Sequence, residues 1–192
     1  LAETAGSFIA AIEEAGRLLD AQGRVLPATA SSVVLTAAAG DRRLSGQKAI
    51  EDSGGPVDAV GIDPPGADAP PEVLRAIADA DQVVLGPGSL FTSVLAVAVV
   101  PGIRSALAAR DGGVVFVCNL RPSKETVGFD VAAHVDALAR HGVAPDVVLA
   151  DPATMDVGRV HGPRVVTAAL AQPNGWSHDA ERLASALSEL AG

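Results

Sequence analysis

Three short, continuous apolar runs constrain the fold of this chain more than any other feature of its sequence. They lie at residues 83–85, 114–118 and 147–149, and segments with helical spacing separate them. A strand that is apolar throughout is typical of a sheet covered on both faces, the usual setting of parallel strands. Strands that alternate with helices of about 10–15 residues indicate βαβ units. The sequence therefore predicts an α/β fold: a single domain over residues 1–192 with a mainly parallel sheet in three α/β/α layers.

Hydrophobic periodicity places the remaining elements. The predicted helices cover residues 3–21, 71–80, 89–110, 130–142 and 178–190. The long helical stretch is predicted to break at Pro101, because proline cannot continue a helix. Further strands are predicted over residues 32–38, 57–63 and 164–170. Residues 40–55 are polar with turn-forming residues at both ends, and neither a strand nor a helix is predicted there.

Charge and composition argue against several classes of function. The net charge is −9 and no basic cluster stands out, which disfavours binding to a nucleic-acid backbone. No apolar run approaches 18 residues, so no membrane span is predicted. The first residues lack the positive stretch of a signal peptide. Cys118 is the only cysteine, which excludes an internal disulfide and fits a reducing, cytoplasmic setting.

The segment that follows the first apolar run is the main candidate site. In open α/β sheets, ligands bind at the carboxyl ends of the strands. Glycines there let the backbone approach an anion, and the N–H groups of the next helix point at it. The same residues also suit a tight turn in which Ser89 caps the helix, and spacing alone leaves both interpretations open. The candidate residues at this corner are Gly86, Pro87, Gly88, Ser89, Thr92 and Ser93.

A second set of polar residues follows the next apolar run. Asn119 offers donors and an acceptor, so it can cap the following segment or bind a base or sugar edge. Arg121 is the arginine best placed to contact an anion, because it lies on a strand-end loop. Glu125 could accept from a ribose or sugar hydroxyl, or bind a metal. Cys118 is interpreted as a packed small hydrophobic residue, since no activating base stands beside it.

His134 and His141 lie seven residues apart on the predicted helix at 130–142 and therefore share a face of this helix. Two histidines without further ligands do not make a metal site. His141 precedes a glycine and is interpreted as a helix-end residue stabilised by the helix dipole. His134 lies nearer the helix start and is a candidate for ligand contact, with a buried structural role as the alternative.

The remaining polar residues are interpreted as structural. His178 and Asp179 precede the last helix and form a capping element. Loop aspartates could hold a divalent cation but more often form turns, which applies to Asp63, Asp68 and Asp151. No Ser-His-Asp order and no HExxH pattern occurs, so no catalytic residue and no metal site is predicted from motifs.

Several of these phrases occur together in one known family. The order LGPGSLFTSVL, PGI, VFVCNL and ETVGF, followed by an HV helix, resembles the YvcK/CofD-like family. The phrases QGRVLPAT and GQKAI are similar to the YvcK branch. The resemblance covers about residues 1–151 and, more faintly, HDAERLASAL. It implies a Rossmann-like α/β/α fold, and an N-terminal glycine-rich segment of the family is expected to be missing from residues 1–192.

The resemblance also implies a function. The YvcK branch contains gluconeogenesis factors that bind UDP-sugars such as UDP-N-acetylglucosamine and support carbon metabolism, cell-wall homeostasis and cell shape, with no established reaction. It implies a nucleotide-sugar ligand at the residues above, and it adds Leu120 and Thr29 to them. The alternative is the CofD branch, which transfers a phospholactyl group in coenzyme F420 biosynthesis with Mg²⁺. The sequence leaves the oligomeric state open, although the helix at 92–100 could form a contact in a homo-oligomer.

Overall fold

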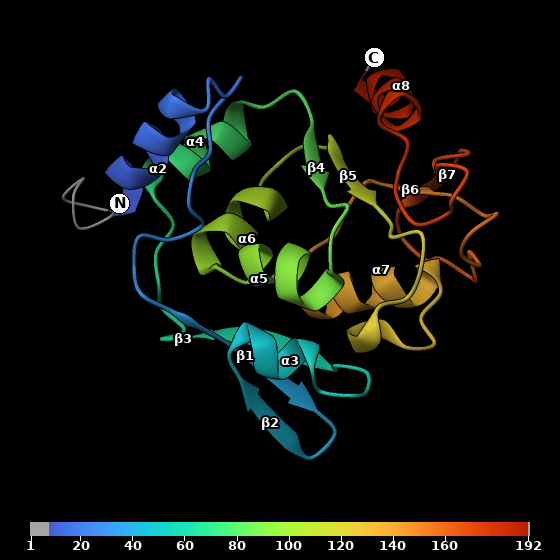
Figure 1. Ribbon diagram of the computed structural model, residues 1–192, viewed down its shortest axis with the longest axis horizontal. Coiled ribbons are helices and arrows are strands. Elements are labelled where there is room, and N and C mark those ends of the chain that lie inside the picture. The colour runs from blue at the N-terminus through green and yellow to red at the C-terminus, as the bar shows by residue number, and fades with distance from the viewer. Residues whose placement is uncertain (1–7, 192) are drawn as a thin grey trace.

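The predicted parallel sheet is present in the structure, a computed structural model that describes residues 8–191. Its four strands are all parallel and follow one another in chain order across the sheet (Figure 1). They are β4 (Val83–Leu85), β5 (Val114–Val117), β6 (Val147–Ala150) and β7 (Arg164–Thr167). β7 ends three residues before the predicted strand at 164–170, and the last bond to β6 runs from the Ala168 amide to the Ala150 carbonyl at 3.0 Å.

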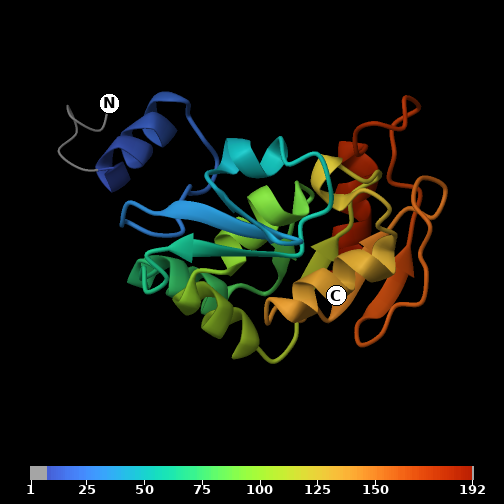
Figure 2. The ribbon, with the colours of Figure 1, turned by 90° about the horizontal axis from the view of Figure 1, so that it is seen from below.

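Helices cover both faces of this sheet, as the apolar runs predict. Along β5, Phe116 faces the main core, whereas Val115 and Val117 face the C-terminal helix α8 (Ala180–Ala191). Helix α7 (Val131–Arg140) packs on the side of Phe116. Figure 2 shows α7 and α8 on opposite sides of the sheet. The predicted α/β/α layering is therefore confirmed.

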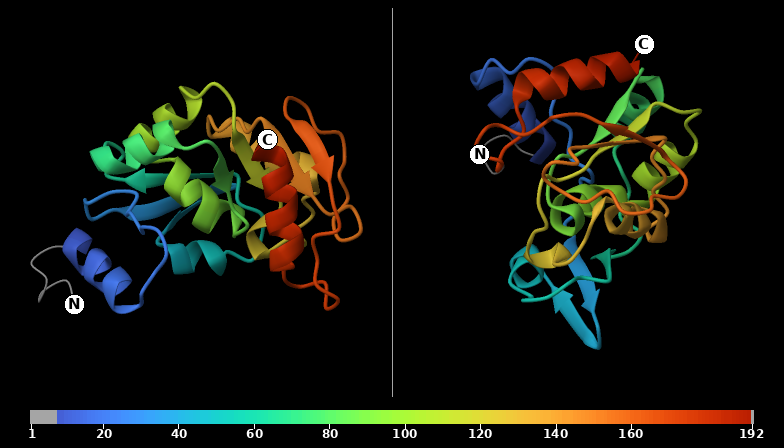
Figure 3. Two further views of the ribbon diagram at one scale, coloured as in Figure 1. Left: turned by 90° about the horizontal axis from the view of Figure 1, so that it is seen from above. Right: turned by 90° about the vertical axis from the view of Figure 1, so that its right-hand side faces the viewer.

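The helices of residues 90–108 and α7 form a layer on one face of the parallel sheet, which we call the helix layer. A second, antiparallel sheet lies on the far side of this layer. It contains β1 (Val34–Ala39), β2 (Arg42–Ser45) and β3 (Ala59–Asp63) in the order β2-β1-β3. The prediction of no regular element over residues 40–55 is wrong, because this segment holds β2 and the helix α3 (Gln47–Glu51). β2 is an exposed edge strand, which forms by backbone pairing with β1 rather than by apolar burial. Figure 3 shows the hairpin of β1 and β2 extending away from the rest of the domain.

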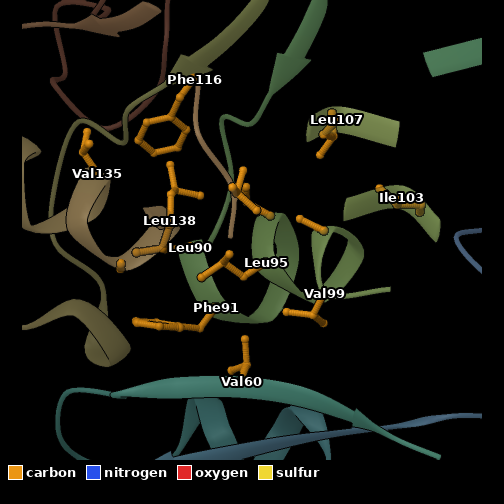
Figure 4. Packing of buried hydrophobic residues seen from close by; sticks show 14 of the residues in the cluster. Val60, Leu90, Phe91, Leu95, Val99, Ile103, Leu107, Phe116, Val135 and Leu138 are labelled. Carbon is orange, nitrogen blue, oxygen red and sulfur yellow. The ribbon is translucent and has the colours of Figure 1, made fainter. Parts of the chain in front are cut away.

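The main core lies between the two sheets. Figure 4 shows Phe91 and Val99 of the helix layer above Val60 of β3, with Phe116 of β5 at the opposite side. All four side chains belong to one buried cluster. Both sheets therefore pack their apolar faces on the same layer of helices.

The predicted helical stretch at 89–110 is divided into three pieces. They are the π-helix η1 (Leu90–Val94), α5 (Leu95–Ala98) and α6 (Pro101–Ala108). Pro101 opens α6 in the first turn, where its missing N–H removes no hydrogen bond. Among residues 8–191, no single helix is long and apolar enough to cross a membrane; only the pair Leu90–Ala98 and Pro101–Ala108, bent by 80°, reaches that length and composition when counted together.

The other helices agree with the predictions to within a few residues. Helix α2 spans Phe8–Leu18, and the first residues of the predicted helix at 3–21 lie outside the described part of the chain. Helix α4 spans Pro71–Asp79. Asp130 caps α7, since its Oδ1 accepts a hydrogen bond from the Ala133 amide at 2.7 Å. A short 3-10 helix, η2 (Lys124–Thr126), precedes α7.

Candidate ligand-binding site at the end of β4

The corner after β4 requires glycine at its first position. Gly86 adopts φ +82°, a left-handed conformation that side chains rarely tolerate. A Cβ atom there would also lie 3.1 Å from the carbonyl oxygen of Val117, at the end of β5. The Gly86–Pro87 peptide bond is cis. The close approach of the two strand ends therefore depends on Gly86.

The corner is joined directly to the loop after β5. The amide of Gly88 donates a hydrogen bond to Oδ1 of Asn119 at 3.3 Å. A Cβ atom at Gly88 would meet Ser93 Cβ at 3.4 Å, an ordinary van der Waals contact. The structure thus brings together two groups of candidate residues that lie 31 positions apart in the sequence.

The residue before η1, Ser89, has hydrogen-bond donors that are available to a ligand. The Ser89 carbonyl accepts hydrogen bonds from the amides of both Ser93 and Val94 at 3.0 Å, which gives the wide turn of a π-helix. Ser89 is the N-cap residue of η1, as the turn interpretation has it, but its side chain makes no capping hydrogen bond. Within residues 8–191, the Ser89 amide finds no hydrogen-bond acceptor. Ser89 therefore presents both an amide and a hydroxyl at the corner.

The buried carboxyl group of Glu125 holds the start of η1 in position. The residue is only 2% exposed, and its Oε1 accepts a hydrogen bond from the Phe91 amide at 3.2 Å. Burial raises the pKa of the Glu125 carboxyl, and the neighbouring Phe91 and Thr92 act in the opposite direction. Among the described residues, neither its Oε2 nor the Thr92 hydroxyl has a hydrogen-bond partner of good geometry. Glu125 and Thr92, both predicted as ligand contacts, are thus largely inside the protein.

A polar pocket of about 360 Å³ adjoins the corner. We call it the α3–η2 pocket, because α3 and η2 form its two sides and Ser89 connects it to the corner. Its lining residues are Lys48, Glu51, Asp52, Ser89, Ser123, Lys124 and Glu125. Sequence reasoning missed five of them. Lys48 and Lys124 are the only lysines of the chain, which was a usable signal, but α3 was not predicted and the spacing did not bring them together.

A second groove, also of about 360 Å³, lies on the other side of the corner along β4. Gly86, Pro87 and Gly88 contribute to its lining, and the rest consists of Ser93 and aliphatic residues of α4, β4, η1, α5 and α6. Val84 and Val97 are 38% and 48% exposed within it. This groove offers van der Waals contact and few polar groups, in contrast to the α3–η2 pocket.

Three predicted contacts lie away from the pocket lining. Arg121 donates from Nε to the Gly175 carbonyl at 2.8 Å, and its guanidinium stacks 4.2 Å above the ring of Trp176. A contact with an anion would compete with both interactions. Leu120 is buried on the α8 side of the sheet. The Thr29 hydroxyl accepts from the Ser31 amide at 3.1 Å and forms a local turn.

Both histidines of α7 have structural surroundings. His134 is fully buried between Phe116 and Phe129, and its Nδ1 bonds the Asp130 carbonyl at 2.7 Å. Burial lowers the pKa of His134. These surroundings match the structural alternative rather than a contact with a ligand at the corner.

His141 carries no helix-stabilising charge in this structure. Its Nδ1 donates to the Ala137 carbonyl at 2.7 Å, and its Nε2 accepts from the Val60 amide at 2.9 Å. A ring that donates from one nitrogen and accepts at the other is neutral. His141 is the C-cap residue of α7, as the sequence indicates. Its ring is held by the Ala137 carbonyl and the Val60 amide rather than by the helix dipole, and it joins α7 to β3.

Cys118 and Asp151 are structural, as the sequence indicates. Burial raises the pKa of the Cys118 thiol to about 12, and its Sγ lies 3.8 Å from the sulfur of Met155. Burial also raises the pKa of Asp151, but hydrogen bonds from three backbone amides outweigh this and leave the pKa below its usual range. Those amides belong to Ala153, Leu170 and Ala171.

The capping role of Asp179 is confirmed, since its Oδ1 accepts from the Arg182 amide at 3.1 Å. In the part of the chain that the structure describes, no three His, Cys, Asp or Glu side chains are placed to hold a metal ion.

One family profile and several individual proteins are similar to this chain. The profile of a family described as 2-phospho-L-lactate transferase CofD matches residues 1–190. A protein of Deinococcus radiodurans is 35% identical over 214 residues, which cover 99% of this chain and 46% of the relative. The gluconeogenesis factor of Bacillus subtilis is 37% identical over 138 residues, which cover 71% of this chain and 44% of the relative. The chain thus spans less than half the length of these two relatives.

A solved structure has the same fold. The crystal structure of a UPF0052 family protein from Bacillus halodurans superposes with a TM-score of 0.88 at 27% sequence identity. The superposition covers 97% of this chain and 68% of the other chain.

Proposed function

The chain belongs to the CofD family, and from its similarity to the gluconeogenesis factor of Bacillus subtilis we propose that it is a gluconeogenesis factor that binds a UDP-sugar of the UDP-N-acetylglucosamine type. The observation that carries the proposal is the corner after β4. It lies at the carboxyl end of a parallel sheet, where open α/β folds bind their ligands. The Ser89 amide there has no acceptor among residues 8–191.

The corner suits a diphosphate for three physical reasons. Gly88 has no side chain, so an anion can approach the backbone closely. The Ser89 amide and hydroxyl are donors at the start of η1, and amides at a helix start favour negative charge. The bond from Gly88 to Asn119 holds the loop in place before a ligand arrives. Because the chain has a net charge of −9, such local donors have to act without a favourable overall field.

In the cell, a protein with this function would regulate carbon metabolism, cell-wall homeostasis and cell shape in response to the level of its nucleotide sugar. A deletion strain is then expected to grow poorly on gluconeogenic carbon sources. The wild-type gene should restore growth, and a gene carrying a substitution that abolishes binding at the corner should not.

Titration calorimetry of the full-length protein with UDP-N-acetylglucosamine tests the binding proposal. We expect Gly88→Val to lower affinity at least about tenfold, because a side chain beside Ser93 would crowd the corner and hinder a close approach of the diphosphate to the backbone. Gly66→Val is the matched control, since a Cβ atom at Gly66 meets no neighbour within 4 Å. Unchanged affinity in a folded Gly88→Val protein would show that the corner is only a turn.

A second pair of variants distinguishes the Ser89 amide from the Ser89 hydroxyl as the donor to the ligand. Ser89 has φ −53°, a value that proline adopts without strain. Ser89→Pro removes the amide hydrogen and the hydroxyl, whereas Ser89→Ala removes only the hydroxyl. If the amide binds the diphosphate, affinity should fall clearly further in Ser89→Pro than in Ser89→Ala. Equal affinities would exclude the amide as a donor.

The description of the matching family favours one alternative, a transferase of the 2-phospho-L-lactate type. Such an enzyme would move a phospholactyl group to a deazaflavin acceptor in the presence of Mg²⁺. Turnover of a phospholactyl donor by the full-length protein distinguishes the two functions. The proposed binding function predicts no turnover with or without Mg²⁺.

A further inference from the structure

The α3–η2 pocket is separate from the corner but shares Ser89 with it. Its walls come from two regions that are distant in sequence, α3 beside the antiparallel sheet and η2 before α7. With a volume of about 360 Å³ it has room for a group of the size of one sugar ring. Any group attached to a phosphate at the corner therefore has a polar cavity directly beside it.

The pocket is lined by three carboxyl side chains and two lysines, which argues against a second phosphate. Lys48 forms an ion pair with Asp52 one helical turn away. Lys124 and Glu51 form no ion pair within residues 8–191, and they contribute opposite charges to the same cavity. A phosphate would meet nearby carboxylates as well as ammonium groups, so its net electrostatic gain would be small. A neutral ligand group is not repelled by these carboxylates.

The pocket contains both hydrogen-bond donors and hydrogen-bond acceptors. Lysine ammonium groups donate, carboxylates accept, and the hydroxyls of Ser89 and Ser123 can do both. Sugar hydroxyls also donate and accept, so they can use all of these partners.

The inner wall adds a further observation. Glu125 is 98% buried yet lines the pocket, and its Oε2 lacks a partner of good geometry among the described residues. Glu125 therefore adds a carboxyl group to the inner wall of the pocket, beside the Thr92 side chain.

We propose that the α3–η2 pocket holds the sugar ring of the nucleotide sugar, with Ser89 between this ring and the diphosphate at the corner. The proposal rests on the proposed function and goes beyond it, because it assigns sugar recognition to α3 and η2. Glu51 and Lys124 bind the hydroxyls of the ring from opposite sides of the pocket. The nucleoside part of the ligand does not enter this pocket.

The test compares UDP with UDP-N-acetylglucosamine by titration calorimetry on the full-length protein. We expect Glu51→Gln and Lys124→Met each to weaken binding of the UDP-sugar about 3- to 10-fold, because Gln replaces a charged acceptor by a neutral one and Met removes the ammonium donor. UDP affinity should change less than about twofold. Glu13→Gln on the distant helix α2 is the matched control and should alter neither affinity. Melting temperatures establish that each variant is folded.

The outcomes separate the inference from the proposed function. If the wild-type protein binds neither ligand, the proposed function fails and the sugar pocket fails with it. If both ligands bind but Glu51→Gln and Lys124→Met leave the UDP-sugar affinity unchanged, only the sugar pocket is wrong. If the two variants weaken UDP and the UDP-sugar equally, the pocket contacts the nucleotide and the inference is overturned, while the binding function stands.

Discussion

The Gly88 amide donates to the Asn119 side chain at 3.3 Å, so the loops after β4 and β5 hold each other in position. Asn119→Ala should lower the free energy of unfolding by about 1 kcal/mol, the typical value of one hydrogen bond. Asn119→Asp keeps an oxygen acceptor and should retain most of the stability, while its charge weakens anion binding. Urea unfolding measures the first effect and calorimetry the second. An Asn119→Ala protein with wild-type stability would contradict the proposed loop contact.

Gly86→Ala should destabilise the protein by roughly 2 kcal/mol, because the new Cβ would combine an unfavourable φ with a 3.1 Å approach to the Val117 carbonyl. Gly40→Ala separates the two causes, since Gly40 also has a positive φ but meets no atom within 4 Å. Thermal or urea unfolding of both variants gives the comparison. We expect the loss to be larger at Gly86, and equal losses would mean that the close approach contributes nothing.

Asp151→Ala should cost on the order of 3 kcal/mol, because three backbone amides lose a charged acceptor inside the protein. Asp151→Asn retains one carbonyl oxygen and should be affected less. Urea unfolding reports the difference, and hydrogen exchange should show the loss of protection at Leu170 and Ala171. Equal stability of the two variants would contradict this role.

Burial lowers the pKa of His134, which makes stability depend on pH. A histidine kept neutral by folding stabilises the protein above its unfolded pKa of about 6.5, and this contribution is lost as pH falls toward the folded pKa. Between pH 7.5 and 5.5, the wild-type protein should therefore lose stability faster than His134→Leu. The difference in slope is at most about 1.4 kcal/mol per pH unit. Parallel pH profiles from urea unfolding would exclude His134 as the cause.

The Cys118 thiol should be nearly inert in the folded protein, because it is buried and its pKa is raised to about 12. At pH 8, a disulfide reagent such as Ellman's reagent should react at least about tenfold faster after denaturation in urea. The matched reference is free cysteine at the same pH. Rapid reaction of the native protein would mean that the end of β5 opens readily.

The parallel half of the fold could be predicted because its strands are buried on both faces. A strand such as β5 has no polar position, and this pattern is visible in the sequence alone. β2 and α3 could not be predicted in the same way. β2 is held by backbone pairing with β1, and α3 has only five residues, so neither carries a clear hydrophobic period.

The candidate site was predicted in part. The sequence placed Gly88 and Asn119 at the ends of neighbouring strands, and the structure joins them by a hydrogen bond. Glu125 was predicted to contact a ligand; in the structure it lines the α3–η2 pocket, and its Oε1 bonds the Phe91 amide. Lys48 and Lys124 were missed, because only the packing of α3 against η1 and η2 brings them to one cavity.

The helix layer that both sheets share has a consequence for how the chain unfolds. Val60 packs its side chain on Phe91, and its amide bonds to His141, so β3 is tied to this layer twice. Among residues 8–191, the buried residues of the antiparallel sheet all belong to the core that this layer shares with Phe116 of the parallel sheet, so separating the two sheets would expose apolar residues of both. The domain should therefore melt in one cooperative step, with equal calorimetric and van't Hoff enthalpies, although it contains two sheets of opposite strand arrangement.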